Sequence, residues 1–124
     1  MKFTDTLKKN HEFRRLYSKG VSAATPHLVI YVRRTKRDTN RIGITVSTKV
    51  GKAVTRNRIR RRLREIYRLS EDNMKRGLEL VIVARVRAAE ASYRELEKSF
   101  VKACRKLDVL ERGMKDEKGP HLAC

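Results

Sequence analysis

The sequence predicts an α+β fold, a two-layer sandwich in which helices cover one face of a four-stranded sheet. Two kinds of periodicity indicate it: strand-like segments alternate apolar and polar residues, and helix-like segments repeat apolar residues every three or four positions. At 124 residues the chain suits one domain with a modest core, and no repeat or linker divides it. We expect the element order αβββαβα in a single domain, residues 1–113, followed by a disordered tail, residues 114–124.

The first predicted helix begins near Asn10, after residues 1–9, which show little periodicity. Three apolar residues then share one helix face at positions i, i+3 and i+4: Phe13, Leu16 and Tyr17. Gly20 is the expected end of this helix. Its two aromatic rings are as compatible with an ordinary core as with a binding surface.

Three strands are expected next, at residues 21–23, 27–34 and 41–47. The second and third alternate clearly, with a core face made of Leu28, Ile30, Val32, Ile42, Ile44 and Val46. The other face is small and polar, and includes Tyr31, Gly43, Thr45 and Ser47. Taken alone, Tyr31 reads as an ordinary half-buried strand residue, but its ring also offers a surface on which a base could stack.

A second helix follows the third strand. Thr55 is its expected cap, and its apolar residues form one stripe: Ile59, Leu63, Ile66 and Tyr67. Residues 69–79 form a polar connection to the next element.

The last strand and the last helix complete the fold. Residues 80–86 are almost continuously apolar, which suits a central strand. Ser92 and Glu95 have the spacing of a capping box. The final helix is expected to run from Tyr93 to near Gly113, with its apolar side on the sheet.

The chain is strongly basic, with a net charge of +18 and a pI near 10.7. Residues 49–68 contain nine Lys or Arg residues and one acid, Glu65, so this stretch alone carries +8. Four of its arginines follow one another at i, i+4 spacing, where like charges repel: Arg56, Arg60, Arg64 and Arg68. A solvated helix face normally mixes signs, and arginine suits forked contact with phosphate. We therefore interpret this helix as a nucleic-acid-binding element.

At about 100° per residue, the basic helix presents two charged surfaces. One flank carries three arginines and an amide: Arg56, Arg60, Arg64 and Asn57. Arg61 and Arg68 project nearly opposite the apolar stripe, and Arg58 lies on the remaining side. In the loop before the helix, Lys49 and Lys52 are placed to hold phosphate.

Nothing in the sequence indicates catalysis by the protein itself or a bound metal. The histidines are scattered, no carboxylate pair or nucleophile motif occurs, and Cys104 and Cys124 indicate neither a disulfide framework nor a zinc site. The longest apolar run, residues 80–84, is far shorter than the roughly twenty residues that span a bilayer, and the chain starts without an apolar signal region. We therefore expect a cytoplasmic protein without a membrane partner.

Three segments carry recognisable motifs: EFRRLYSKG at residues 12–20, RIGITVS at 41–47 and KVGKAVTRNRIRRRLRE at 49–65. Together they resemble the protein subunit of bacterial ribonuclease P, over about residues 5–110. The most specific feature is the RNR triplet Arg56-Asn57-Arg58. The resemblance implies a ribonucleoprotein that removes the 5′ leader of precursor tRNA. Catalysis is then performed by magnesium ions in the RNA subunit, and the protein side chains hold no cofactor.

The resemblance also implies which residues bind each RNA. The leader groove would lie between the basic helix and the sheet, with Phe13, Tyr17, Tyr31, Thr45, Ser47, Arg60 and Arg64. The RNA subunit would dock on Lys49, Lys52, Arg56, Asn57, Arg58, Arg61, Arg62 and Arg68. A left-handed crossover from strand 41–47 to strand 80–86 is implied as well, although the general rule favours a right-handed one in about 98% of parallel crossovers.

Two other classes of protein share part of this pattern. A ribosomal or ribosome-assembly protein without a nuclease role is also small, basic and α+β, but it needs no groove that joins aromatic residues to an arginine flank. A duplex-DNA binder could place the basic helix in the major groove. That helix, however, has few residues suited to reading bases apart from Asn57 and the arginines.

Overall fold

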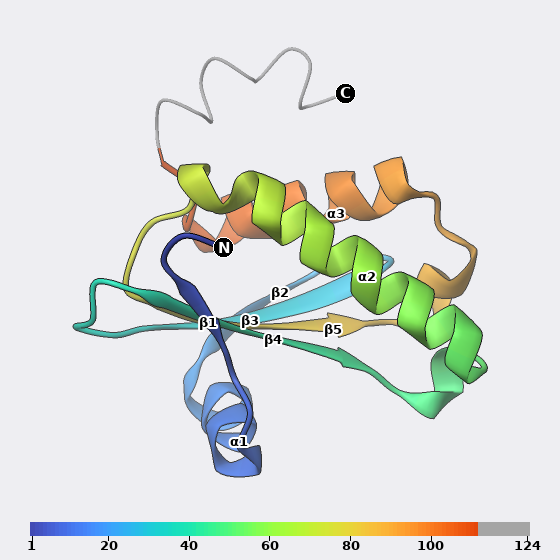
Figure 1. Cartoon of the computed structure of the whole chain (residues 1–124), viewed down its shortest axis with the longest axis horizontal. Coiled ribbons are helices and arrows are strands. Elements are labelled where there is room, and N and C mark those ends of the chain that lie inside the picture. The colour runs from blue at the N-terminus through green and yellow to red at the C-terminus, as the bar shows by residue number, and fades with distance from the viewer. Residues whose placement is uncertain (112–124) are drawn as a thin grey trace.

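The structure, a computed structural model, describes residues 1–111. Within them, three α-helices lie on the two faces of a five-stranded sheet (Figure 1). The α+β class predicted from the periodicity is confirmed. None of the helices in this part of the chain is long and apolar enough to cross a membrane. The tail predicted at 114–124 lies outside the described residues.

The elements follow one another in the order β1, α1, β2, β3, β4, α2, β5, α3, with three short 3-10 turns between them. The helices are α1 Asn10–Lys19, α2 Ala53–Ser70 and α3 Tyr93–Leu107. The strands are β1 Thr4–Thr6, β2 Val21–Ala24, β3 Leu28–Arg34, β4 Asn40–Val46 and β5 Leu78–Ala84. The 3-10 turns are η1 Thr48–Val50, η2 Glu71–Asn73 and η3 Val86–Glu90.

The sheet has the strand order β1-β4-β5-β3-β2. β5 lies in the centre, parallel to β4 and antiparallel to β3, as its continuous apolar sequence predicted. β2 pairs with β3 in an antiparallel hairpin. α2 connects β4 to β5, so a helical crossover joins these neighbouring parallel strands. The left-handed sense expected for it stays a prediction.

β1 makes the sheet five-stranded, so the predicted four-stranded sheet is wrong, and so is the order αβββαβα, which lacks this strand. β1 pairs in parallel with β4, with Thr4 opposite Asn40 and Thr6 opposite Ile42. All three residues of β1 are polar, so its sequence shows no alternation of apolar and polar residues. This strand depends instead on the edge that β4 offers and on contacts with a distant part of the chain.

A buried carboxylate provides those contacts. Glu71, just after α2, is 3% exposed and accepts hydrogen bonds from the N–H groups of Lys2 (2.7 Å) and Phe3 (3.0 Å). The Thr4 hydroxyl donates to the same carboxylate at 2.6 Å and bonds to the Tyr67 hydroxyl at 2.8 Å. Burial alone would raise the pKa of Glu71, but these hydrogen bonds outweigh it and keep the pKa below its usual value.

The two faces of the sheet carry separate cores. α2 and α3 cover one face, where the larger core includes Leu28, Ile30, Ile59, Leu63, Leu80, Ile82 and Phe100. α1 crosses the opposite face (Figure 1), and Leu16 packs there with Leu7 and Val81. The two-layer prediction is therefore wrong, because the sheet lies between α1 and the α2–α3 layer. β5 accounts for the difference, since its central residues are buried on both faces.

Two helices begin earlier than predicted. α1 has Lys9 at its N-cap, and the predicted cap Asn10 is its first helical residue. α2 has Lys52 at its N-cap, so the predicted cap Thr55 lies inside the first turn. Lysine cannot accept a hydrogen bond from a helix N–H, so neither N-cap residue marks its helix in the sequence; at α1 the Glu12 carboxylate accepts the Lys9 N–H at 3.2 Å instead.

The capping box of α3 is confirmed, but its predicted end is wrong. The Ser92 hydroxyl accepts the Glu95 N–H at 3.1 Å, and the Glu95 carboxylate accepts the Ser92 N–H at 2.9 Å. α3 stops just before Asp108, which adopts a left-handed conformation with φ 57°, so the helix does not reach Gly113. The strand predicted at 80–86 is shifted two residues toward the N-terminus.

Candidate nucleic-acid interface

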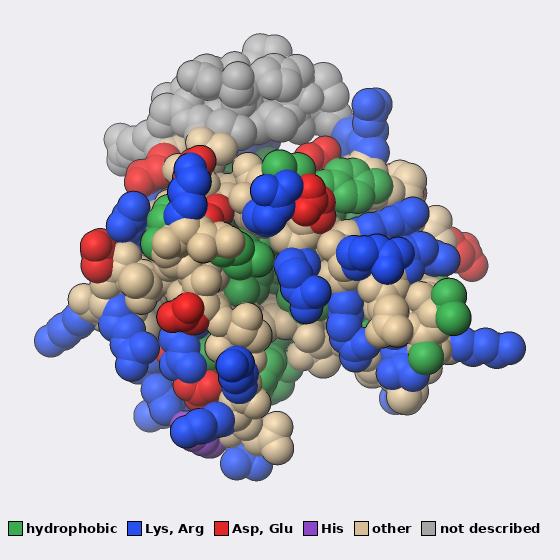
Figure 2. Space-filling view, in the orientation of Figure 1, with side chains coloured by type: hydrophobic (Ala, Val, Ile, Leu, Met, Phe, Trp, Pro, Cys, Tyr) green, Lys and Arg blue, Asp and Glu red, His purple; other side chains and the backbone are tan. Residues whose placement is uncertain are grey.

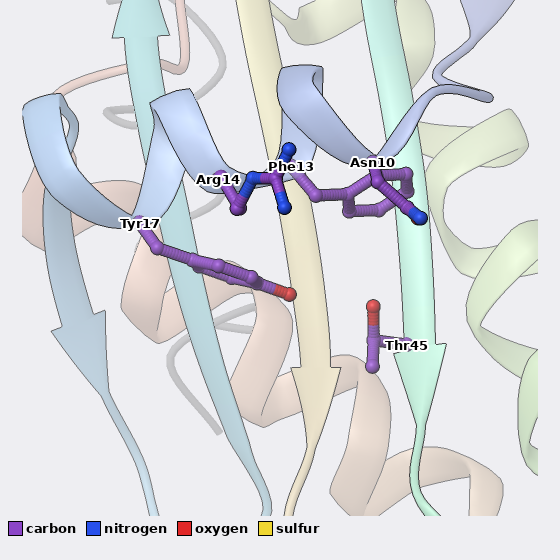
Figure 3. Close-up of a pocket in the computed structure, with 5 residues that line it drawn as sticks. All are labelled: Asn10, Phe13, Arg14, Tyr17 and Thr45. Carbon is purple, nitrogen blue, oxygen red and sulfur yellow. The ribbon is translucent and has the colours of Figure 1, made fainter.

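A pocket of about 390 Å³ opens between α1 and the sheet (Figure 3). α1 contributes Asn10, Phe13, Arg14 and Tyr17 to its lining, and β4 contributes Thr45. The hydroxyl ends of Tyr17 and Thr45 both point into the opening (Figure 3). Aromatic rings bordered by hydroxyl, amide and guanidinium groups can stack on an unpaired base and bond to its edge.

Two tyrosines extend the aromatic surface from α1 to β3. The rings of Tyr17 and Tyr31 meet edge to face, with centroids 4.9 Å apart. Tyr17 is 42% exposed, whereas Tyr31 is half-buried and packs against the small core around Leu16. Tyr17 thus offers the accessible ring, and Tyr31 holds it in place.

Phe13 joins this pocket to a second one. Its half-buried ring lies against Gly43 of β4, where an added Cβ would stand 2.5 Å from Phe13 Cε1. Glycine at this position therefore lets the ring approach the strand. Phe13 also lines a pocket of about 230 Å³, together with Leu7, Gly43, Ile44, Arg60 and Arg64. We call the two pockets that meet at Phe13 the groove.

Arg60 and Arg64 form the basic side of the groove, and they lie on the α2 flank indicated by the helical angles. Arg60 is held in place from two sides. Its Nη1 donates to Asn57 Oδ1 at 3.1 Å, and its Nη2 lies 3.5 Å from the carbonyl oxygen of Val46 at the end of β4. A guanidinium that is already oriented loses less side-chain entropy when it binds phosphate.

Ser47, expected in the groove, takes a different place. β4 ends at Val46, and Ser47 is the N-cap of η1, where its hydroxyl accepts the Lys49 N–H at 3.3 Å. Ser47 lines neither of the two pockets of the groove. The geometry thus gives Ser47 a role in shaping the loop that carries Lys49.

Three half-buried arginines of α2 are tied to backbone carbonyls of neighbouring segments. The bonds join Arg56 to Gly51 (3.1 Å), Arg58 to Ala89 (3.0 Å) and Arg62 to Ala91 (3.4 Å). They fasten η3 and the loop before α2 to the helix. The arginine side chains are thereby ordered before any partner arrives.

The other cations of this region are exposed: Lys49, Lys52, Arg61, Arg64 and Arg68. Figure 2 shows Lys and Arg side chains gathered over the part of the surface that α2 forms. Arg68 pairs with Glu65 at 2.7 Å, and its hydrogen bonds hold the pKa of that carboxyl below its usual value. We call the following set the docking face: Lys49, Lys52, Arg56, Asn57, Arg58, Arg61, Arg62 and Arg68.

No cluster of metal ligands accompanies this surface. Within residues 1–111, no group of three or more His, Cys, Asp or Glu side chains could hold a metal ion. His27 Nδ1 is hydrogen-bonded to Ser99 Oγ at 2.8 Å. Cys104 is buried in the core, and burial raises the pKa of its thiol. Cys124 and His121 lie outside the described residues.

Fold and interface together define a small, strongly basic α+β protein built to bind nucleic acid. A family model described as Ribonuclease P matches residues 1–108. The chain belongs to the ribonuclease P protein family.

Relatives and solved structures agree with this assignment. The chain is 42% identical to the ribonuclease P protein component of Natranaerobius thermophilus over 109 residues, which covers 88% of this chain and 95% of the relative. Identity to the Clostridioides difficile component is 43% over 107 residues, covering 86% and 94%. The Staphylococcus aureus RNase P protein structure superposes with a TM-score of 0.80 at 32% identity, covering 86% of this chain and 97% of that one.

As a member of this family, the chain is the protein component of an endoribonuclease that acts in the 5′ maturation of tRNA. Its partner is the RNase P RNA. This decides against the ribosomal-protein and duplex-DNA alternatives.

Two residues of the groove were missed in the sequence. The sequence pattern indicates only a helix cap at Asn10 and no role for Arg14, yet both line the larger pocket. Their spacing contains a signal: Asn10 and Arg14 are four positions apart and flank Phe13 and Tyr17 on the same face of α1.

Proposed function

We propose that the groove holds the single-stranded 5′ leader of precursor tRNA while the docking face binds the RNase P RNA. The observation that carries this proposal is the position of Phe13, which lines both pockets. Because of it, stacking surfaces at Tyr17 and phosphate-binding groups at Arg60 and Arg64 form one continuous path. Single-stranded nucleic acid is bound by this combination of aromatic platforms and a basic channel.

The docking face has the chemistry of a contact with a folded RNA. Its exposed cations lie on the outward side of α2 and in the loop before it, away from the apolar stripe that packs on the sheet. Three of its arginines are already fixed by carbonyl contacts. Such a surface recognises the phosphate backbone of a structured RNA without reading its bases.

The rest of the proposal concerns the assembled enzyme. Catalysis is assigned to magnesium ions held by the RNA subunit. Cytoplasmic location and a left-handed β4–α2–β5 crossover belong to the same proposal.

Reconstitution tests the function as a whole. The purified chain is combined with a ribonuclease P RNA and a precursor tRNA at low magnesium, and leader cleavage is measured. We expect cleavage only when protein and RNA are both present, because the protein supplies binding rather than chemistry. Cleavage by the protein alone would contradict this assignment, and so would a protein that does not promote cleavage by the RNA.

A pair of variants tests the division between groove and docking face. Tyr17→Ala removes an exposed ring of the groove, and a lost base stack of about 1–3 kcal/mol lowers precursor affinity about tenfold to hundredfold. Arg61→Ala should instead weaken assembly with the RNA subunit and leave the preference for precursor over mature tRNA intact. The measurement is the affinity of assembled holoenzyme for both tRNAs at saturating protein. The assignment fails if the two variants show the reverse pattern.

A further inference from the structure

The outer edge of β4 is open where the groove passes it. β1 ends at Thr6, opposite Ile42 of β4. β4 continues to Val46 and pairs with β5 along its whole length. Residues 43–46 therefore have a strand on one side and, within the described chain, none on the other. Gly43 and Ile44 from this open stretch line the smaller pocket of the groove.

Hydrogen bonds reveal which backbone groups point to this edge. They join Asn40 N–H to Phe3 O (2.8 Å), Leu7 N–H to Ile42 O (2.8 Å) and Arg60 Nη2 to Val46 O (3.5 Å). In a strand, the N–H and C=O of one residue point to the same side, and this side alternates with a period of two. The N–H and C=O of Ile44 therefore also face the open edge, and Ile44 lines the same pocket as Arg60 and Phe13.

We infer that the main chain of Ile44 binds the edge of one unpaired base of the leader. Its N–H donor and C=O acceptor lie side by side, and the edges of nucleobases carry an acceptor and a donor in the complementary arrangement. Arg60 and Arg64 border the same pocket and suit the phosphate of that nucleotide. This inference rests on the proposed role of the groove and adds a base contact to its stacking surfaces.

An added peptide strand fits this edge less well than a base. Strand addition uses a row of successive backbone pairs along an edge. Here the carbonyl of Ile42 is taken by Leu7 and that of Val46 is approached by Arg60, so Ile44 is left as a single donor–acceptor pair. One such pair matches one base.

The test replaces the amide before Ile44 by an ester, through incorporation of the α-hydroxy analogue of isoleucine. This change removes the N–H and keeps the side chain. Holoenzyme assembled with the variant should bind precursor tRNA about two- to tenfold more weakly, the effect of one lost hydrogen bond, and mature tRNA equally well. Precursors with an abasic nucleotide at each leader position then locate the contact. When the abasic nucleotide stands at the contacted position, the variant and the unmodified protein should bind the precursor with equal affinity.

A matched control is the same substitution at Ala24, an exposed residue whose N–H points to the outer edge of β2, since the Thr25 N–H bonds inward to Leu28 O. It should leave both affinities unchanged. The inference is overturned if the Ile44 ester binds precursor normally, or if its loss persists with every abasic precursor. An unmodified holoenzyme without any preference for precursor would refute the proposed function, and the inference with it. RNA-subunit binding by both esters checks that they are folded.

Discussion

Two regions of this protein use the same charged residues in opposite ways. At the end of the sheet near the β3–β4 turn, cations meet acids: Arg33 with Glu79 (2.9 Å), Arg41 with Glu12 (2.6 Å), Lys75 with Asp108 (3.4 Å), Arg76 with Asp38 (3.5 Å) and Lys2 with Asp72 (3.0 Å). Within α2, by contrast, the ion pair that the described residues form is Arg68 with Glu65. The first region is the paired end, and the second, α2, carries most of the docking face.

The difference separates charges that serve the fold from charges that await a partner. At the paired end, Glu79 and Glu12 are largely buried and hold strands and α1 together through their arginines. Along α2, arginines repeat at i, i+4 spacing and repel one another, which costs helix stability. A polyanion offsets that repulsion, so RNA binding and stability of α2 are expected to be linked.

Salt should reveal the largest effect. If the docking face makes about six to ten phosphate contacts, affinity for the RNase P RNA falls roughly 10³- to 10⁵-fold between about 50 and 200 mM monovalent salt. Displaced counterions cause this fall, and the paired end contributes little because its charges are already neutralised. Equilibrium titration across this range measures it. A nearly flat dependence would show that the unpaired arginines do not contact phosphate.

Glu79→Gln should have the next largest effect, and on a different quantity. The Glu79 side chain is 8% exposed, bonds to Arg33 and lies 3.8 Å from Arg41. Without its charge, Arg33 loses its anion and Arg41 keeps only Glu12, so the free energy of unfolding should fall by about 2 kcal/mol, roughly a thirtyfold change in the folding equilibrium. Urea denaturation measures this. The salt dependence of RNA binding should remain as in the unmodified protein. A changed slope with unchanged stability would show that Glu79 serves RNA binding rather than the fold.

Substitution of single arginines tests the same difference between the docking face and the paired end. Arg61 is exposed on the docking face, so Arg61→Ala should lower the slope of log affinity against log salt by about one contact and weaken RNA binding by about tenfold or less. Arg33→Ala is the matched control from the paired end. It should lower stability and leave the slope unchanged. Equal effects of the two variants on the slope would mean that Arg33 contacts RNA although it pairs with Glu79.

Local signals made much of the fold predictable. The apolar stripe of α2 and the alternation in β3 and β4 lie within single elements, and so does the capping box at Ser92, so the sequence alone indicates them. β1 was missed because its pairing depends on Glu71, a residue far along the chain. The third layer was missed because the burial of Val81 beneath α1 looks the same in the sequence as burial beneath α2.

The groove shows the same limit. Helical angles alone place Arg60 and Arg64 on one flank of α2, and Phe13 is expected to share a helix face with Tyr17. The meeting of these two sets at Gly43 depends on how α1 crosses the sheet, which no spacing reveals. Likewise, the bond from Arg58 to the Ala89 carbonyl requires the position of η3.

The smallest expected effect comes from an acid of the paired end and depends on pH. Burial alone would raise the pKa of Glu12, but hydrogen bonds from the Lys9 and Lys8 N–H groups and from Arg41 outweigh it and lower the pKa to about 2. A lowered pKa stabilises the fold above the unfolded value near 4.3, and this stabilisation is lost as the pH falls from there toward 2. Glu12→Gln should therefore cost about 1 kcal/mol at pH 7, after allowance for solvent screening, and progressively less below about pH 4.

Urea denaturation of wild type and Glu12→Gln from pH 7 to pH 3 measures this difference. Glu65→Gln is the control from α2, where the carboxyl also has a lowered pKa but its pair with Arg68 is exposed to solvent. Exposed pairs contribute little to stability, so the control should differ from wild type less than Glu12→Gln does at pH 7. A Glu12→Gln difference that does not change with pH would mean that the Arg41 pair and the backbone hydrogen bonds do not hold the Glu12 charge in the folded protein. The charge of Glu12 at the paired end would then contribute no more to the stability of the fold than the charge of Glu65 on α2.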